Sequence, residues 1–149
     1  MSEFDFTLTH EFRAPRALVF RQWTNAGDIS AWFAPESFEI TACEADARPG
    51  GNWMVRYQAK GGEPIEERGA YLTIDAPALL EFTLQHHWAS GSTGPELRCT
   101  VRFTETTSGT RVEFTQKGIP SAGMRDGMRD GWGECFRKLV RHIEEEVAA

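Results

Sequence analysis

Two adjacent histidines are the residues best suited to acid–base or metal chemistry. His86 and His87 follow Leu80, Phe82 and Leu84, which occupy alternate positions. Because successive side chains of a strand point to opposite faces, His86 is expected to share the apolar face and His87 to point away. The pair therefore cannot bind one metal ion together, and the usual zinc-ligand spacings are missing, so no metal is expected. His86 is either a polar anchor or proton carrier inside an apolar site, or a hydrogen-bonded histidine near a strand end.

Other groups that could do chemistry lack the usual activating motifs. Cys43, Cys99 and Cys135 are far apart, form no C-x-x-C pair and are predicted to be free thiols. The sequence has no Gly-x-Ser-x-Gly elbow, phosphate-binding loop or dinucleotide-binding fingerprint, so no cofactor is expected. Enzymatic activity stays open, because proton transfer needs only one positioned acid or base. The charged run that includes Glu67 is interpreted as a solvated face.

The distribution of charge limits the class of partner. The chain carries a net charge of −6 and has no cluster of Lys and Arg, which argues against nucleic acids and anionic membrane surfaces. No apolar run approaches the roughly 20 residues that span a bilayer. The first residues are acidic and already alternate, unlike a targeting peptide. We therefore expect a cytoplasmic protein with one domain, residues 1–149, that binds neither nucleic acid nor a membrane.

The elements that must position these residues are an antiparallel sheet and a long helix. Two short helices are expected at residues 16–24 and 29–33, with a break between them. The links between the later elements are short and contain Gly, Pro, Asp or Ser, which indicates antiparallel pairing. A long amphipathic helix is expected after Ser121, a predicted N-cap. Alternating hydrophobicity predicts seven strands, at residues 4–13, 38–45, 52–59, 65–74, 79–87, 96–105 and 111–117.

A single helix is too narrow to cover the inner face of a curved seven-stranded sheet, so a space is expected between them. Gly123, Gly127 and Gly131 recur every four residues in the first half of that helix. They line a ligand space, allow close packing of the helix on the sheet, or give the helix an irregular N-terminal turn. For each aromatic residue near this space, core packing is the alternative to ligand contact. The candidate ligand-binding residues are Trp32, Trp53, Tyr71, Phe82, His86, Trp88, Met124, Met128 and Trp132.

Segments at residues 12–15, 19–24, 32–35, 46–53, 69–74, 80–84 and 131–132 carry a family resemblance. Among them, the Arg-Pro-Gly-Gly-x-Trp turn that ends at Trp53 and the late Gly131-Trp132 are the most specific. In these segments the chain resembles the START-like (SRPBCC), helix-grip superfamily, and within it bacterial homologues of the C-terminal domain of the heat-shock-protein-90 ATPase activator. The resemblance implies an α+β helix-grip fold, a seven-stranded curved antiparallel sheet wrapped around a long C-terminal helix, with two short helices after the first strand.

Members of this superfamily bind lipids, hormones or aromatic polyketides, and others are cyclases and hydrolases. The resemblance therefore implies binding of a small, largely apolar molecule, lipid-, aromatic- or polyketide-like, between the sheet and the C-terminal helix. Two alternatives stay open: a cyclase- or hydratase-type enzyme that uses a cavity acid or base such as His86, and a stress-related protein-interaction module. Whether the protein forms a homodimer is also left open.

Overall fold

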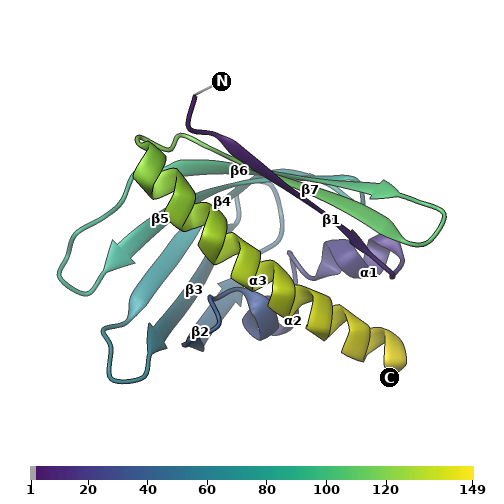
Figure 1. The fold of residues 1–149 in the computed structure, drawn as a ribbon, viewed down its shortest axis with the longest axis horizontal. Coiled ribbons are helices and arrows are strands. Elements are labelled where there is room, and N and C mark those ends of the chain that lie inside the picture. Colours follow the sequence, from purple (N-terminus) through teal and green to yellow (C-terminus); the bar gives the residue numbers. More distant parts are fainter. Residues whose placement is uncertain (1–2) are drawn as a thin grey trace.

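The computed structural model describes residues 3–149 and shows one curved sheet with a long helix across it (Figure 1). All neighbouring strands are antiparallel, in the order β1-β7-β6-β5-β4-β3-β2. The strands are β1 (Phe6–Phe12), β2 (Phe38–Ala45), β3 (Asn52–Ala59), β4 (Ile65–Asp75), β5 (Leu79–Trp88), β6 (Leu97–Glu105) and β7 (Thr110–Lys117). The helices are α1 (Arg16–Arg21), α2 (Ala26–Trp32) and α3 (Ala122–Ala148). The predicted α+β helix-grip architecture is confirmed.

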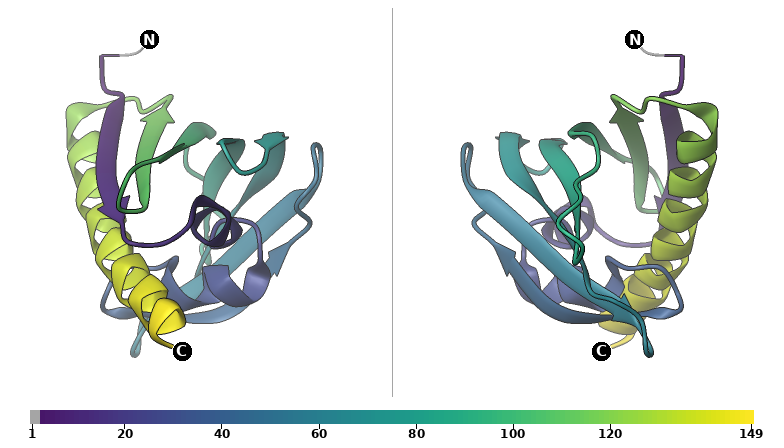
Figure 2. Two further views of the ribbon diagram at one scale, coloured as in Figure 1. Left: turned by 90° about the vertical axis from the view of Figure 1, so that its right-hand side faces the viewer. Right: turned by 90° about the vertical axis from the view of Figure 1, so that its left-hand side faces the viewer.

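The sheet curls around the side that α3 crosses (Figure 2). In β6, for example, Leu97, Cys99, Val101 and Phe103 are buried, whereas the residues between them are exposed or half-buried. This alternation places one apolar face on the concave side, where α3 covers it. The helices α1 and α2 lie near the C-terminal half of α3 (Figure 1). Much of the core therefore lies between the sheet and this helical layer.

The start of α2 differs from the prediction. The sequence pattern predicted a break at residues 25–28, but the helix begins at Ala26. Asn25 is its N-cap, and the Asn25 side-chain oxygen accepts a hydrogen bond of 3.1 Å from the backbone N–H of Asp28. An Asn at this position satisfies one of the free N–H groups of the first turn, so the residues predicted to form a break start the helix instead.

The strands beside the candidate site are held together by the Trp53 indole. Trp53 on β3 pairs directly with Gly69 on β4, and its Nε1 donates a hydrogen bond of 3.0 Å to the carbonyl of Thr83 on β5. The indole therefore crosses β4 at a residue without a side chain. A Cβ on Gly69 would lie 1.8 Å from the Thr83 carbonyl oxygen. Glycine is needed here because β5 approaches the β4 backbone so closely.

The two halves of α3 pack differently. Ser121 caps the helix as predicted, accepting a hydrogen bond of 3.2 Å from Met124 N. The buried side chains of α3 begin only at Trp132, ten residues after its start, and continue to Ile143. The first half instead contains the repeated glycines, and a Cβ added to any of these three would meet no atom within 4 Å. Close helix–sheet packing is therefore not the reason for these glycines.

Candidate functional site

A cavity of about 250 Å³ lies between β3–β5 and the first half of α3. Its wall is mostly apolar, with a few polar groups that converge from the sheet. It reaches solvent where Trp88, 40% exposed, and the exposed Gly127 stand at its edge. The lining residues are Phe33, Pro35, Tyr57, Glu67, His86, Trp88, Pro95, Met124, Gly127, Met128, Gly131, Trp132 and Cys135. Apolar cavities with a few convergent polar groups are the usual form of small-molecule sites.

The polar part of the cavity is a three-residue group made by neighbouring strands. Glu67 on β4 is the register partner of His86 on β5 and of Val55 on β3, two residues from Tyr57. The Tyr57 hydroxyl donates a hydrogen bond to Oε2 of Glu67. Nε2 of His86 lies 3.6 Å from the same oxygen. The sheet register alone therefore brings a phenol, a carboxyl and an imidazole together at an apolar surface.

Burial dominates the electrostatics of this group. Glu67 is only 7% exposed, and burial raises the pKa of its carboxyl above the ordinary value of 4.5, against the opposing effects of His86 and of the Tyr57 hydrogen bond. Burial, assisted by the neighbouring carboxyl, also raises the pKa of the Tyr57 phenol. A raised carboxyl pKa in a cavity is a common property of binding and acid–base groups.

The interpretation of Glu67 as part of a solvated face is wrong. Its neighbours Glu66 and Arg68 do point outward, but Glu67 is buried on the inner face. The signal was present in the sequence, because Glu67 has the parity of Ile65 and Tyr71 along the strand. Neither Glu67 nor Tyr57 is among the predicted ligand-binding residues. For Glu67 the reason is that a run of charged residues was interpreted as a unit instead of position by position.

The structure divides the nine predicted ligand-binding residues into two groups. Five of them line the cavity, namely His86, Trp88, Met124, Met128 and Trp132. The other four, Trp32, Trp53, Tyr71 and Phe82, lie outside it and are buried in the core. There the rings of Trp53 and Phe82 pack edge to face, 5.7 Å apart, and Trp32 Nε1 donates to the Gln22 carbonyl at 3.1 Å. The space between these core rings is only about 10 Å³, too small for a ligand.

A family model described as "Activator of Hsp90 ATPase homolog 1-like protein" matches residues 13–144. The chain belongs to this family. The predicted resemblance is thereby confirmed, and solved structures of family proteins share the fold. A protein from Nitrosomonas europaea is 25% identical, with a TM-score of 0.83 over 100% of both chains.

Two more distant structures show the fold alone. The AHSA1 protein from Silicibacter pomeroyi is 20% identical, with a TM-score of 0.87 over 95% of this chain and 99% of its own. An AHSA1-like protein from Aeromonas hydrophila is 19% identical, with a TM-score of 0.75 over 97% of this chain and 95% of its own. A search of curated proteins found no match. Within residues 3–149, no helix has the length and apolarity needed to span a membrane.

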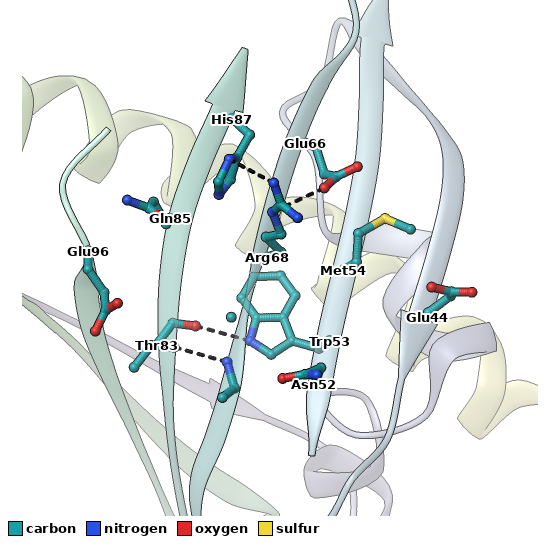
Figure 3. A pocket seen from close by; sticks show the side chains of 12 residues that line it. Glu44, Asn52, Trp53, Met54, Glu66, Arg68, Thr83, Gln85, His87 and Glu96 are labelled. Atoms are coloured by element: carbon teal, nitrogen blue, oxygen red, sulfur yellow. Dashed lines mark hydrogen bonds and ion pairs between the residues drawn. The ribbon is translucent and has the colours of Figure 1, made fainter. Parts of the chain in front are cut away.

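A larger hollow of about 640 Å³ lies on the outer face of the sheet of this protein (Figure 3). Three of its polar side chains pair with one another: Arg68 donates to Nδ1 of His87 at 3.0 Å, and its Nε lies 3.3 Å from Glu66. The lining of this hollow mixes polar and apolar groups, whereas the inner cavity is lined mostly by apolar side chains. The smaller inner cavity is therefore the better candidate site for a small molecule.

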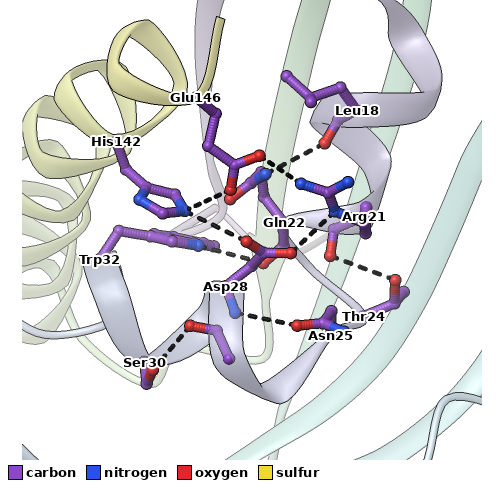
Figure 4. A network of polar contacts seen from close by, with 11 residues as sticks. Leu18, Arg21, Gln22, Thr24, Asn25, Asp28, Ser30, Trp32, His142 and Glu146 are labelled. Atoms are coloured by element: carbon purple, nitrogen blue, oxygen red, sulfur yellow. Dashed lines mark hydrogen bonds and ion pairs between the residues drawn. The ribbon is translucent and has the colours of Figure 1, made fainter. Parts of the chain in front are cut away.

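A second polar cluster joins the three helices (Figure 4). Asp28, His142 and Glu146 offer ligand atoms that lie within 4.8 Å of one another, the arrangement of a possible cation site. However, Arg21 already forms ion pairs with both carboxylates, and His142 Nε2 lies 3.3 Å from Asp28 and 3.0 Å from Glu146. Burial disfavours the Asp28 carboxylate, but these polar contacts outweigh it and lower its pKa below 3.8. Both carboxylates of the cluster therefore already have partners within the protein.

The three cysteines are free, as predicted. Cys99 and Cys135 are buried, and burial raises the pKa of both thiols. Burial also raises the pKa of Cys43, to about 11. A thiol with a raised pKa is a poor nucleophile, because the thiolate is the reactive form. The cavity therefore has an apolar thiol in its wall, at Cys135, and not an activated nucleophile.

Proposed function

We propose that the protein binds a small, largely apolar molecule in the cavity between β3–β5 and the first half of α3. The observation that carries the proposal is that Gly127 and Gly131 line a space that their missing side chains leave open. Each glycine costs the helix about 0.5–1 kcal/mol relative to Ala, so a gain elsewhere is needed to explain them. Met124 and Met128 beside them are flexible side chains that adapt to the shape of a ligand.

The volume of the cavity limits the ligand. An apolar cavity of about 150 Å³ holds benzene, so in proportion a space of 250 Å³ fits about ten non-hydrogen atoms. Two fused aromatic rings or a medium-length alkyl chain have this size. A larger lipid or polyketide would have to extend past Trp88 into solvent. Ligand binding between the sheet and the long helix also agrees with the use of this fold to hold hydrophobic molecules.

The proposal is tested by titrating the protein with 1-ethylnaphthalene in an isothermal calorimeter. We expect saturable binding, and we expect Gly131→Leu to abolish it by filling the cavity. Gly123→Leu is the matched control, because Gly123 lies on the same helix but does not line the cavity. Binding that is absent in the folded wild type, or equally strong in both variants, would reject this cavity as the site.

The Tyr57–Glu67–His86 group also favours a second function, an enzyme of the cyclase or hydratase type. A buried carboxyl whose pKa is raised can act as a general acid, and the His86 ring lies beside it. For a substrate that is turned over, His86→Ala and Glu67→Gln should each lower kcat by about 100-fold or more. A kcat unchanged in both variants would exclude this function.

A further inference from the structure

We propose that the ligand of this cavity is a small amine, with an apolar body of about ten non-hydrogen atoms and its nitrogen at Oε1 of Glu67. The inference rests on the proposed binding function and specifies the chemistry of the ligand. It follows from three features of the cavity: an accepting oxygen without a partner, aromatic side chains in the wall, and a lining without cationic residues.

The first feature is the free oxygen of a buried carboxyl. Both contacts of the Glu67 carboxyl, from the Tyr57 hydroxyl and from His86 Nε2, are to Oε2. Among residues 3–149, no hydrogen bond is made to Oε1. Oε1 is also not fully shut off from solvent. It therefore borders open space, which here is the cavity that Glu67 lines. A buried carboxyl oxygen that faces an otherwise apolar space is a specific acceptor for a donor on the ligand.

The second feature is the set of aromatic rings in the wall of the same cavity. Phe33, Tyr57, Trp88 and Trp132 all line the same cavity. Aromatic faces attract an ammonium group through the ring quadrupole, and several rings around a small volume form the cages that bind amines and quaternary ammonium groups. Rings alone would accept any flat apolar molecule, but rings together with an acceptor oxygen favour a ligand that is apolar at one end and cationic at the other.

The third feature is the charge of the lining. None of the residues that line the cavity is Lys or Arg, within the part of the chain that the structure describes. A ligand carboxylate would therefore lie next to Glu67 with only His86 available as a cationic partner. An ammonium group instead forms a charge-assisted hydrogen bond with a carboxyl that folding has already removed from water. The cavity thus selects against fatty acids and other apolar anions.

Protonation of the empty site is consistent with this selection. Burial raises the pKa of Glu67, so the empty cavity favours the neutral acid, and an ammonium group shifts it toward the carboxylate. The titratable groups that face Glu67 are Tyr57 from β3, His86 from β5, Cys99 from β6 and Cys135 from α3. Burial raises the pKa of the phenol and of both thiols, which keeps all three neutral.

The test compares four probes built on one ring system: 1-naphthylmethylamine, 1-naphthylmethanol, 1-ethylnaphthalene and 1-naphthoate. Calorimetric titrations at pH 7 give the dissociation constant of each for the wild-type protein. We expect the amine to bind about tenfold or more tightly than 1-ethylnaphthalene, the alcohol to lie between them, and the naphthoate to bind most weakly. An amine that binds no more tightly than 1-ethylnaphthalene would overturn the inference without any variant.

Glu67→Gln then tests the assigned atom, with circular dichroism as the check that the variant folds. The amide keeps the shape of the side chain but removes its charge, so we expect the advantage of the amine to disappear while 1-ethylnaphthalene binds as before. Glu66→Gln is the control, because it removes the neighbouring carboxylate that points outward from β4, and it should preserve the advantage. An advantage that survives Glu67→Gln would overturn the assignment. If 1-ethylnaphthalene also fails to bind the wild type, the binding function itself is rejected.

Discussion

Replacing both Gly127 and Gly131 by Ala tests whether open space separates the first half of α3 from the sheet. At both positions an added Cβ would meet no atom within 4 Å, so the methyl groups cause no clash. Each substitution then contributes only the helix preference of Ala, about 0.5–1 kcal/mol. We expect the free energy of unfolding to rise by about 1–2 kcal/mol, and Tm to rise by roughly 2–8 °C for a chain of this size.

The assay is urea unfolding followed by circular dichroism, which separates a change in stability from a change in the slope of the transition. Gly69→Ala is the contrasting variant, since its Cβ would lie 1.8 Å from the Thr83 carbonyl oxygen. We expect this variant to lose about 1–3 kcal/mol or more. If the double alanine variant were destabilised as well, the first half of α3 would have to pack tightly against the sheet, and the cavity would not exist as described.

Three further predictions concern the buried polar groups. Because the pKa of Glu67 is raised in the folded state, its ionisation opposes folding, and Glu67→Gln should gain stability relative to the wild type as the pH rises above 4.5. The gain should be at most about 1.4 kcal/mol per pH unit. Urea unfolding across pH 4–8 measures this gain, and a difference that does not change with pH would contradict it. Trp53→Phe should cost about 1–3 kcal/mol, because the Thr83 carbonyl loses its indole partner; an unchanged urea midpoint would refute this role. Arg21→Met should lower the free energy of unfolding by about 0.5–1 kcal/mol at pH 7. This loss should shrink as the pH falls to 3.8 and below, because Asp28 then takes up a proton and no longer pairs with Arg21. A loss in urea unfolding that does not change with pH would argue against the ion pairs.

The sequence pattern was sufficient to predict the fold and the inward face of the apolar strand residues, but not the inward face of Glu67 or the depth of the site. Alternation correctly placed His86 and Phe82 on the inner face of β5. It could not show that Phe82 lies under the helical layer with Trp53, whereas His86, four residues further on, lies in the open cavity. That difference depends on where α3 leaves the sheet, which is a property of the packed molecule.

The polar group of the cavity was hidden for a related reason. Tyr57, Glu67 and His86 come from three strands, and their meeting depends on the register of two strand pairs. The β4–β5 pair also contains an irregularity between Tyr71 and Thr73, which shifts the register and which no local pattern specifies. A sequence predicts which residues face inward, but only the assembled sheet fixes which of them become neighbours.

The asymmetry of α3 connects the stability of the protein to its proposed function. The C-terminal half of the helix is fixed by buried side chains from Trp132 to Ile143 and by the polar contacts of His142 and Glu146 with the other helices. Because this half supplies the anchoring, the first half can keep glycines and methionines over the cavity without loss of the fold. Substitutions in the two halves should therefore differ in effect: those near Ile143 should destabilise the fold, and those at Gly131 should change ligand affinity without destabilising it.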